Sequence, residues 1–140
     1  MISTRADCLI DTNVLVYAFT RKGASEPRRD KARALLASVN FGTSAQILQE
    51  FFVVVTQKVS VKMPVGQAGR YVEQLSRLPC VPVDAHLVVS AIAICRRFKI
   101  SYWDAAVLAA AEELGVTTVY TEDLNHRQKY GTVTVINPFK

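Results

Sequence analysis

The sequence predicts an α/β domain built around a mainly parallel sheet. Three observations support this fold class. The 140 residues match the size of one ordinary domain, half of them are apolar, and short apolar runs alternate with longer segments of helical periodicity. Such a chain can bury a core without disulfides or metal ions. It shows no repeat, low-complexity tract or linker, so residues 1–140 are expected to form one domain.

The first part of the chain predicts one buried strand and two helices. Residues 6–10 are a short, mostly apolar run, which is typical of a strand buried on both faces. A helix is expected at residues 13–19 and a loop at residues 23–27. Residues 28–39 carry apolar or small side chains at helical spacing, with a basic outer face. A brief strand or turn is expected at residues 40–42.

A longer helix is expected between residues 43 and 60. Thr43 and Gln46 have the spacing of a capping box, although the stretch FFVVV in this segment favours a strand. Pro64 can open a further helix that reaches about residue 77. Residues 79–83 contain two prolines, so they predict a short strand at a sheet edge or an irregular one.

The last part of the chain predicts two helices followed by two strands. The helices are expected at residues 85–98 and 101–114, with Gly115 as the stop of the second. The strands are expected at residues 116–120 and 132–136, where the side chains are mostly β-branched or apolar.

Composition limits the compartment and the partners. No apolar stretch approaches the roughly 18 residues of a membrane span, and the N-terminus lacks a signal-peptide pattern, so a cytoplasmic protein without a membrane partner is expected. Cys8, Cys80 and Cys95 form no CxxC pair and are odd in number, which favours buried thiols over a zinc site or disulfides. The net charge of +5 suits a polyanionic partner.

Two acidic residues follow predicted buried strands. Asp11 and Asp123 both lie just past the carboxyl end of a strand, which is where ligands bind in parallel sheets. Asp11 could instead cap the next helix. Asp123 could be an ordinary polar loop residue, and its neighbour Glu122 is a rival candidate for the same site.

Two further acids are predicted on helices. Glu50 shares a helix face with Val53 and Val54, so its carboxylate needs a partner or a cation unless this face is solvated. Asp104 stands three residues after Ser101, which is capping-box spacing, so it can be a cap, a ligand or both.

Carboxylates that converge cannot all stay ionised without a compensating cation. Oxygen-only ligand sets suit Mg²⁺ or Mn²⁺, and such ions can activate water and stabilise a phosphoryl transition state. An acidic, metal-loaded site within a basic surface is therefore a sensible design for a phosphodiesterase.

Four stretches resemble, in order and approximate spacing, the motifs of the PIN-domain family. They are residues 9–17 (LIDTNVLVY), 44–51 (SAQILQEF), 101–105 (SYWDA) and 120–125 (YTEDLN). Each contains one of the four acids described above, and together they cover almost the whole chain. The compact length further resembles the VapC-type toxins of toxin–antitoxin pairs.

The resemblance implies a three-layer α/β/α fold with a short parallel sheet, and endonucleolytic cleavage of RNA with Mg²⁺ or Mn²⁺. By analogy, the catalytic and metal-binding residues are Asp11, Asp104, Glu50 and Asp123, and the supporting polar residues are Thr12, Asn13 and Thr121. The resemblance also implies a cognate antitoxin protein and a homodimer. Apolar side chains at residues 51–55 and 87–94 could form the dimer surface or simply fill the core.

Two other functions remain open at this level. A non-catalytic PIN-like module that binds RNA or protein would be indicated by lost acids, and none is lost. A metal-dependent phosphatase with a nucleophilic aspartate would need a second aspartate two residues after Asp11, where Asn13 stands.

Basic and aromatic residues near the motifs have less specific interpretations. His126, Arg127 and Lys129 either contact phosphates or form a solvated loop. Trp103 and Phe98 are predicted to lie in the core, without a role in base stacking.

Overall fold

The computed structural model describes residues 5–20 and 26–140. The strands in this part of the chain are β1 (Cys8–Ile10), β2 (Phe41–Ser44), β3 (Cys80–Val81), β4 (Thr118–Tyr120), β5 (Lys129–Tyr130) and β6 (Val133–Ile136). They form one sheet in the order β3-β2-β1-β4-β6-β5. All pairings are parallel except that of β5 with β6. The predicted mainly parallel sheet is confirmed.

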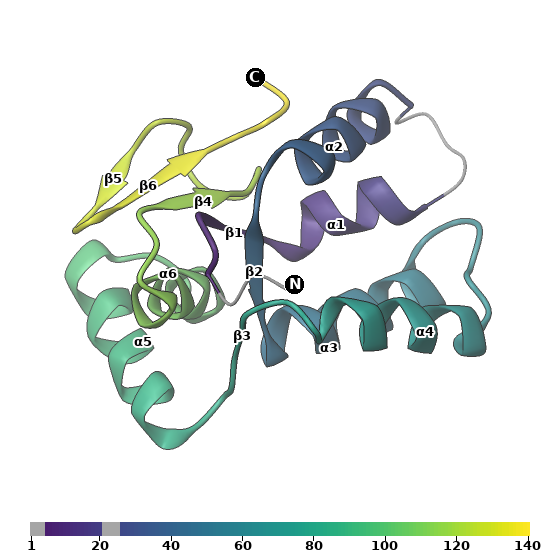
Figure 1. Cartoon of the computed structure of the whole chain (residues 1–140). Coiled ribbons are helices and arrows are strands. Elements are labelled where there is room, and N and C mark those ends of the chain that lie inside the picture. The colour runs from purple at the N-terminus through teal and green to yellow at the C-terminus, as the bar shows by residue number, and fades with distance from the viewer. Residues whose placement is uncertain (1–4, 21–25) are drawn as a thin grey trace.

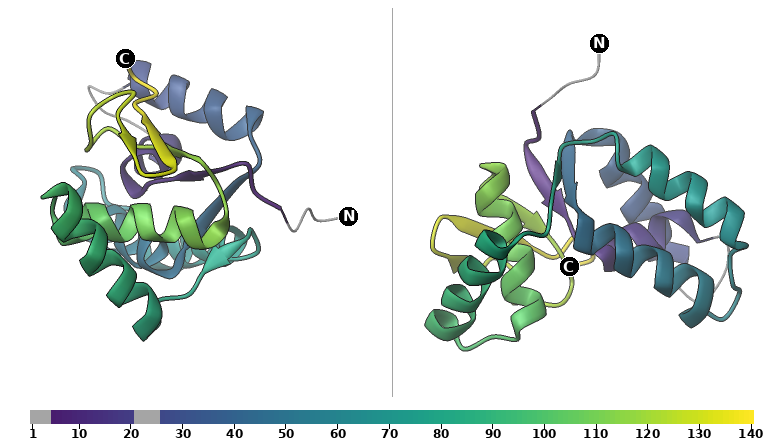
Figure 2. Two further views of the ribbon diagram at one scale, coloured as in Figure 1. Left: turned by 90° about the vertical axis from the view of Figure 1, so that its left-hand side faces the viewer. Right: turned by 90° about the horizontal axis from the view of Figure 1, so that it is seen from below.

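Helices cover both faces of this sheet. They are α1 (Thr12–Phe19), α2 (Glu26–Ser38), α3 (Ala45–Val53), α4 (Val65–Leu75), α5 (Ala85–Phe98) and α6 (Tyr102–Leu114), with a π-helix η1 (Val54–Lys58) that continues α3. Figure 1 shows α1 to α4 on one side of the sheet and α5 with α6 on the other, and the right-hand view of Figure 2 separates the same two groups. The expected three-layer α/β/α arrangement is confirmed.

Most predicted elements are correct to within a few residues. Helix α5 matches its prediction, β3 lies at a sheet edge, and Gly115 ends α6 in the left-handed region with φ 80°. Residues 23–25 of the predicted loop lie outside the described residues, but Glu26 and Pro27 already belong to α2, because proline is tolerated in the first turn of a helix. Strand β5 was not predicted.

The start of α3 corrects the predicted capping box. Ser44 caps this helix, and its Oγ accepts a hydrogen bond from the Ile47 backbone N–H at 3.1 Å. Thr43 belongs instead to β2, where its hydroxyl is buried without a hydrogen-bond partner among the described residues. The segment continues β2 for two residues beyond the predicted turn, so the helix begins later than the spacing suggested.

The core lies between the sheet and its two helix layers. Strand β1 is buried throughout, and α6 buries every residue from 105 to 111. Phe51 on α3 is completely buried, so Phe51→Ala should cost about 3–5 kcal/mol of stability. The three cysteines are free thiols. None of the helices in residues 5–20 and 26–140 is long and apolar enough to cross a membrane.

The strand register brings three chain segments to one edge of the sheet. Ile10 pairs with Tyr120, so the residues that follow them, Asp11 and Thr121, are neighbours across β1 and β4. Strand β2 lies on the other side of β1 and ends at Ser44, where α3 begins. The carboxyl ends of β1, β2 and β4 therefore open toward the same region.

Candidate functional site

Thr121 is the centre of a hydrogen-bond network at this edge of the sheet. Its hydroxyl donates to Asp11 Oδ2 at 2.9 Å and accepts from Asn13 Nδ2 at 3.1 Å and from the Asp123 backbone N–H at 3.2 Å. A hydroxyl has one donor and two acceptor positions, so all of its capacity is used. Thr121 is only 1% exposed, and it therefore ties Asp11, Asn13 and Asp123 together through one buried atom.

Asp11 is the most buried acid of the site. Its Oδ1 accepts from the Thr12 backbone N–H at 2.7 Å, so it caps α1 while Oδ2 faces Thr121. Burial raises the pKa of Asp11 to about 7, and the nearby Asp123 and Glu50 carboxylates add to this rise, against the hydrogen bonds from Thr12 and Thr121. A carboxyl in this state is stabilised as an anion when a cation binds beside it.

The neighbours Asp123 and Glu122 turn to different partners. Asp123 is exposed, and its Oδ2 accepts from Asn13 Nδ2 at 3.0 Å. The Glu122 carboxylate instead accepts from the Tyr17 hydroxyl at 3.0 Å and lies 3.6 Å from Arg28 Nη1. The structure thus joins Asp123 to the buried network and gives the Glu122 carboxylate a separate contact with α1 and α2.

Glu50 reaches the site from α3. Its Oε2 accepts from the Thr12 hydroxyl at 3.2 Å, and its Oε1 accepts from Gln46 Nε2 at 3.1 Å. Glu50 is half-buried, so these two donors satisfy a carboxylate that is partly removed from water. Gln46 was missed in the sequence as a site residue, although its position four residues before Glu50 on the same helix could have indicated the contact.

Asp104 reaches the same region from the first turn of α6. The Ser101 hydroxyl accepts from the Asp104 backbone N–H at 3.1 Å, which confirms Ser101 as the predicted cap. Partial burial raises the pKa of the Asp104 carboxyl, and Asp123 and Glu50 raise it further, whereas a hydrogen bond with the Ser101 side chain lowers it. Because charges raise a neighbouring pKa in this way only at short range, Asp104 on α6 lies near the acids of the sheet edge and of α3.

The four acids, all among the described residues, do not form a ready-made ligand cluster. Among the described residues, no three His, Cys, Asp or Glu side chains lie close enough together to hold a metal ion. The donor chemistry still fits a hard cation, since the facing groups are carboxylate and hydroxyl oxygens. Mg²⁺ keeps several of its waters and needs only one or two carboxylates directly, so spaced acids are compatible with it.

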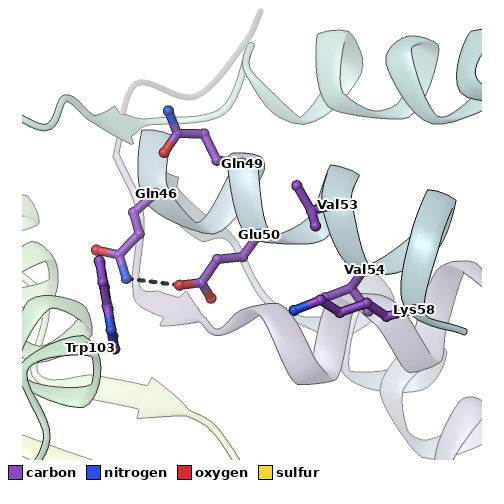
Figure 3. Close-up of a pocket in the computed structure, with 7 residues that line it drawn as sticks. All are labelled: Gln46, Gln49, Glu50, Val53, Val54, Lys58 and Trp103. Atoms are coloured by element: carbon purple, nitrogen blue, oxygen red, sulfur yellow. Dashed lines mark hydrogen bonds between the residues drawn. The ribbon is translucent and has the colours of Figure 1, made fainter.

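Two open cavities adjoin at Glu50 and Val54. One of about 350 Å³ is lined in part by the acidic residues Glu50, Glu122 and Asp123, whereas Asp11 and Asp104 do not belong to its lining. The other, about 420 Å³, lies between α3, η1 and Trp103 (Figure 3). Trp103 is 63% exposed, so the prediction that it lies in the core is wrong.

The remaining predicted residues lie away from this site or organise the loop beside it. Phe98 is partly buried and packs edge-on against Tyr130, with ring centroids 5.3 Å apart. His126 Nδ1 accepts from the Asn137 backbone N–H at 2.9 Å, so this histidine ties the loop between β4 and β5 to the residue that follows β6. Arg127 has a positive φ of 68°, and Lys129 begins β5. Phosphate contact by these residues stays a prediction.

Residues 8–131 match the family described as PIN domain. The chain belongs to the PIN domain family. No curated protein sequence matches it. The match spans all four motif segments, so the family predicted from the resemblance is confirmed.

Solved structures share the fold of this PIN domain. A toxin–antitoxin complex from Klebsiella pneumoniae has a TM-score of 0.70 and 19% identity, covering 94% of this chain and 97% of its own. The Mycobacterium tuberculosis toxin VapC20, described as cleaving the sarcin–ricin loop, has a TM-score of 0.67 and 19% identity over 83% of this chain and 91% of its own. FitAB bound to a DNA fragment has a TM-score of 0.67 and 21% identity over 95% and 96%. At these identities the likeness concerns the fold.

Proposed function

We propose that this PIN domain is a metal-dependent endoribonuclease and the toxin of a toxin–antitoxin pair, acting as one domain in the cytoplasm. The observation that carries the proposal is the convergence of Asp11 and Asp123 on the buried Thr121 hydroxyl, at the carboxyl ends of two paired parallel strands. The hydrogen bonds that Asp11 accepts come from uncharged donors, the Thr12 backbone N–H and the Thr121 hydroxyl, and not from a basic side chain. Acids gathered in this way at the ends of parallel strands favour a bound cation over an internal salt bridge.

Asp11 and Asp104 would be the principal ligands of Mg²⁺ or Mn²⁺, and Glu50 and Asp123 would complete the site directly or through water. When bound, the ion would lower the pKa of a water and offset negative charge on the phosphoryl group. The uncharged residues position these acids: Thr121 orients Asp11, Asn13 orients Asp123, and Thr12 with Gln46 orients Glu50.

The substrate and the protein partner are proposed by analogy with the similar structures. VapC20 is described as cleaving the sarcin–ricin loop, and the Klebsiella structure is a toxin–antitoxin complex. RNA is accordingly the proposed substrate, and an antitoxin protein is the proposed partner. The net charge of +5 suits the first of these.

We also propose a homodimer, with a smaller surface than the sequence suggested. Phe51, Val55 and Leu87 belong to the core and cannot form an interface. On α5, however, Val89 is 67% exposed and Ile92 is 45% exposed. Light scattering at micromolar concentration should give the dimer mass, and a clean monomer would refute this point.

The function is tested by incubating the purified protein with total RNA and Mg²⁺ or Mn²⁺, with and without EDTA. Defined cleavage products should form with the ion and disappear with EDTA. A folded Asp11→Asn variant is the matched control and should leave the RNA intact. Cleavage that persists in EDTA, or in this variant, would contradict the assignment.

A further inference from the structure

Trp103 is a large aromatic side chain that the fold leaves in solvent. It is 63% exposed in the first turn of α6, directly before Asp104. Its ring meets the Tyr102 ring in a T-shaped contact with centroids 5.1 Å apart, so the exposed indole has a fixed neighbour. Exposed aromatic surface beside a functional site is typical of a ligand contact.

The cavity beside Trp103 carries three kinds of chemistry. Figure 3 shows the Trp103 ring at one end, the Lys58 ammonium at the other and the Glu50 carboxylate between them. Val53 and Val54 supply an apolar wall. The cavity volume of about 420 Å³ is in the range of small-molecule sites.

Two glutamine amides complete the lining. Gln46 and Gln49 lie on successive turns of α3, and the Gln46 amide donates one of its two N–H groups to Glu50, which leaves its oxygen and its second N–H for a ligand. Amide groups of this kind can hydrogen-bond the edge of a nucleobase.

The π-helix η1 forms the far wall of the cavity. Its wider turns carry Val54 and Lys58, both of which line the cavity. Short π-helical segments are costly and occur frequently at functional sites. Here the segment sets a cationic side chain at the end of the cavity that lies away from the indole (Figure 3).

We infer that the cavity between Trp103 and Lys58 binds one unpaired nucleotide of the RNA, with the base stacked on the Trp103 indole. A nucleotide matches the indole, the amides and the ammonium of the lining: the base takes the indole face and the amides, and the phosphate takes the Lys58 ammonium. An apolar protein segment would fill the same volume but would leave the amides and the ammonium without partners.

The position of the nucleotide follows from Glu50. Because Glu50 lines both this cavity and the cavity lined by Asp123, the bound nucleotide lies next to the phosphodiester that would be cleaved there. This statement rests on the proposed function, whereas the binding of an unpaired base does not. The cavity therefore selects single-stranded RNA or a loop, because a base within a duplex cannot leave its stack without cost.

The test uses Trp103 as its own probe, since it is the single tryptophan of the chain. The full-length protein in EDTA is titrated with a short single-stranded RNA, the same RNA as a duplex, and the same RNA with abasic residues. The single strand should quench the tryptophan emission in a saturable way. The duplex and the abasic strand should change it little at the same concentrations.

Variants then separate stacking from charge. Trp103→Ala should weaken the binding of single-stranded RNA by about 10-fold or more. In the cleavage assay it should raise KM by about the same factor, with a smaller change in kcat. Trp103→Phe should recover part of the lost affinity. Lys58→Ala should weaken binding mainly at low salt. Lys62→Ala, four residues later and outside this cavity, is the matched control and should bind as the wild type does.

The outcomes distinguish this inference from the proposed function. If the protein cleaves RNA with metal but no RNA changes the tryptophan emission, the stacking site is refuted and the nuclease assignment stands. A wild-type KM in Trp103→Ala has the same meaning. The cavity would then suit a protein partner. Saturable quenching by single strands alone supports the stacking site even if no RNA is cleaved, a result that would refute only the nuclease.

Discussion

Asp11 and Asp104 approach the site from different kinds of element. Asp11 directly follows a buried strand and is 5% exposed, and its carboxylate accepts one hydrogen bond from the next residue, Thr12, and one from Thr121, which the strand register places beside it. Asp104 lies in the first turn of a helix, is partly exposed, and its recorded partner is Ser101 on the same turn. Asp11 is therefore held by a partner on a neighbouring strand as well as by a local one, whereas the partner of Asp104 is local only.

The difference has a consequence for substitutions. At the sheet edge, the Asp11 carboxylate both caps α1 and carries the negative charge of the site, so one substitution changes both. On α6 they are separate, because the cap is made by the Ser101 hydroxyl and the Asp104 backbone N–H. Changes at the two positions should therefore affect stability differently even where both abolish activity.

The largest effect is expected from Asp11→Asn. The amide oxygen can still accept from the Thr12 N–H, so the fold should persist, but the anion is lost. Cleavage should fall by more than about 100-fold, because even the loss of outer partners of metal ligands costs about 10- to 100-fold. Single-turnover cleavage and circular dichroism measure the two properties, and a folded variant with wild-type rates would exclude a catalytic role for Asp11.

Next in size is the pH dependence of stability in EDTA. Folding raises the pKa of Asp11 from 3.8 to about 7, so the folded state holds a proton that the unfolded state has released. Its contribution to stability is complete below about pH 4 and is lost as pH rises toward about 7. The shift of roughly 3 pKa units corresponds to at most about 4 kcal/mol.

Denaturant unfolding between about pH 4 and pH 8 measures this loss. The raised pKa of Asp104 acts in the same direction. Asp11→Asn should show a flatter profile, and Mn²⁺ should restore stability to the wild type at the upper end of the range by binding the native state. A wild-type profile that rises over this interval would contradict the burial of an uncompensated carboxyl.

Asp104→Gln removes the charge of residue 104 but keeps its backbone hydrogen bond to the Ser101 cap. The bond from the backbone N–H of residue 104 to Ser101 survives the change, so stability in EDTA should change by less than about 1 kcal/mol, within the range of a single neutral hydrogen bond. Cleavage should be lost, and Mn²⁺ should stabilise this variant less than the wild type. Paired thermal melts and a cleavage assay decide the point; normal cleavage would leave Asp104 as a helix residue only.

The smallest effect is expected from Glu122→Gln. Glu122 contacts Tyr17 and Arg28, and an amide can keep the bond with the Tyr17 hydroxyl, so cleavage should stay within about 2-fold of the wild type. Asp123→Asn, one residue later, is its matched partner and should reduce cleavage by at least about 10-fold. The measurement is the initial rate of cleavage by the two variants, side by side. If Glu122→Gln were the slower enzyme, Glu122 rather than Asp123 would be the site residue.

Local pattern was sufficient to predict most of the fold and the place of two acids. Short apolar runs identified β1 and β4, and the residue after each run lies at the carboxyl end of its strand because neighbouring parallel strands end together. Gly115 and the periodicity of α5 were likewise read from adjacent residues. These features depend on backbone preferences and on the spacing of apolar side chains, and both are properties of the local sequence.

Tertiary packing decided between neighbours that pattern could not separate. Ser44 rather than Thr43 caps α3 because the pairing of β2 with β3 keeps the chain extended as far as residue 44. Asp123 rather than Glu122 joins Thr121 because Tyr17 and Arg28, distant in sequence, hold the other carboxylate. Trp103 has the hydrophobicity of a core residue but is 63% exposed, and it borders the cavity lined by α3 and η1. Hydrophobicity and spacing predict which side chains favour burial or capping, but the partner that meets each side chain comes from a distant segment and is set only when the chain folds.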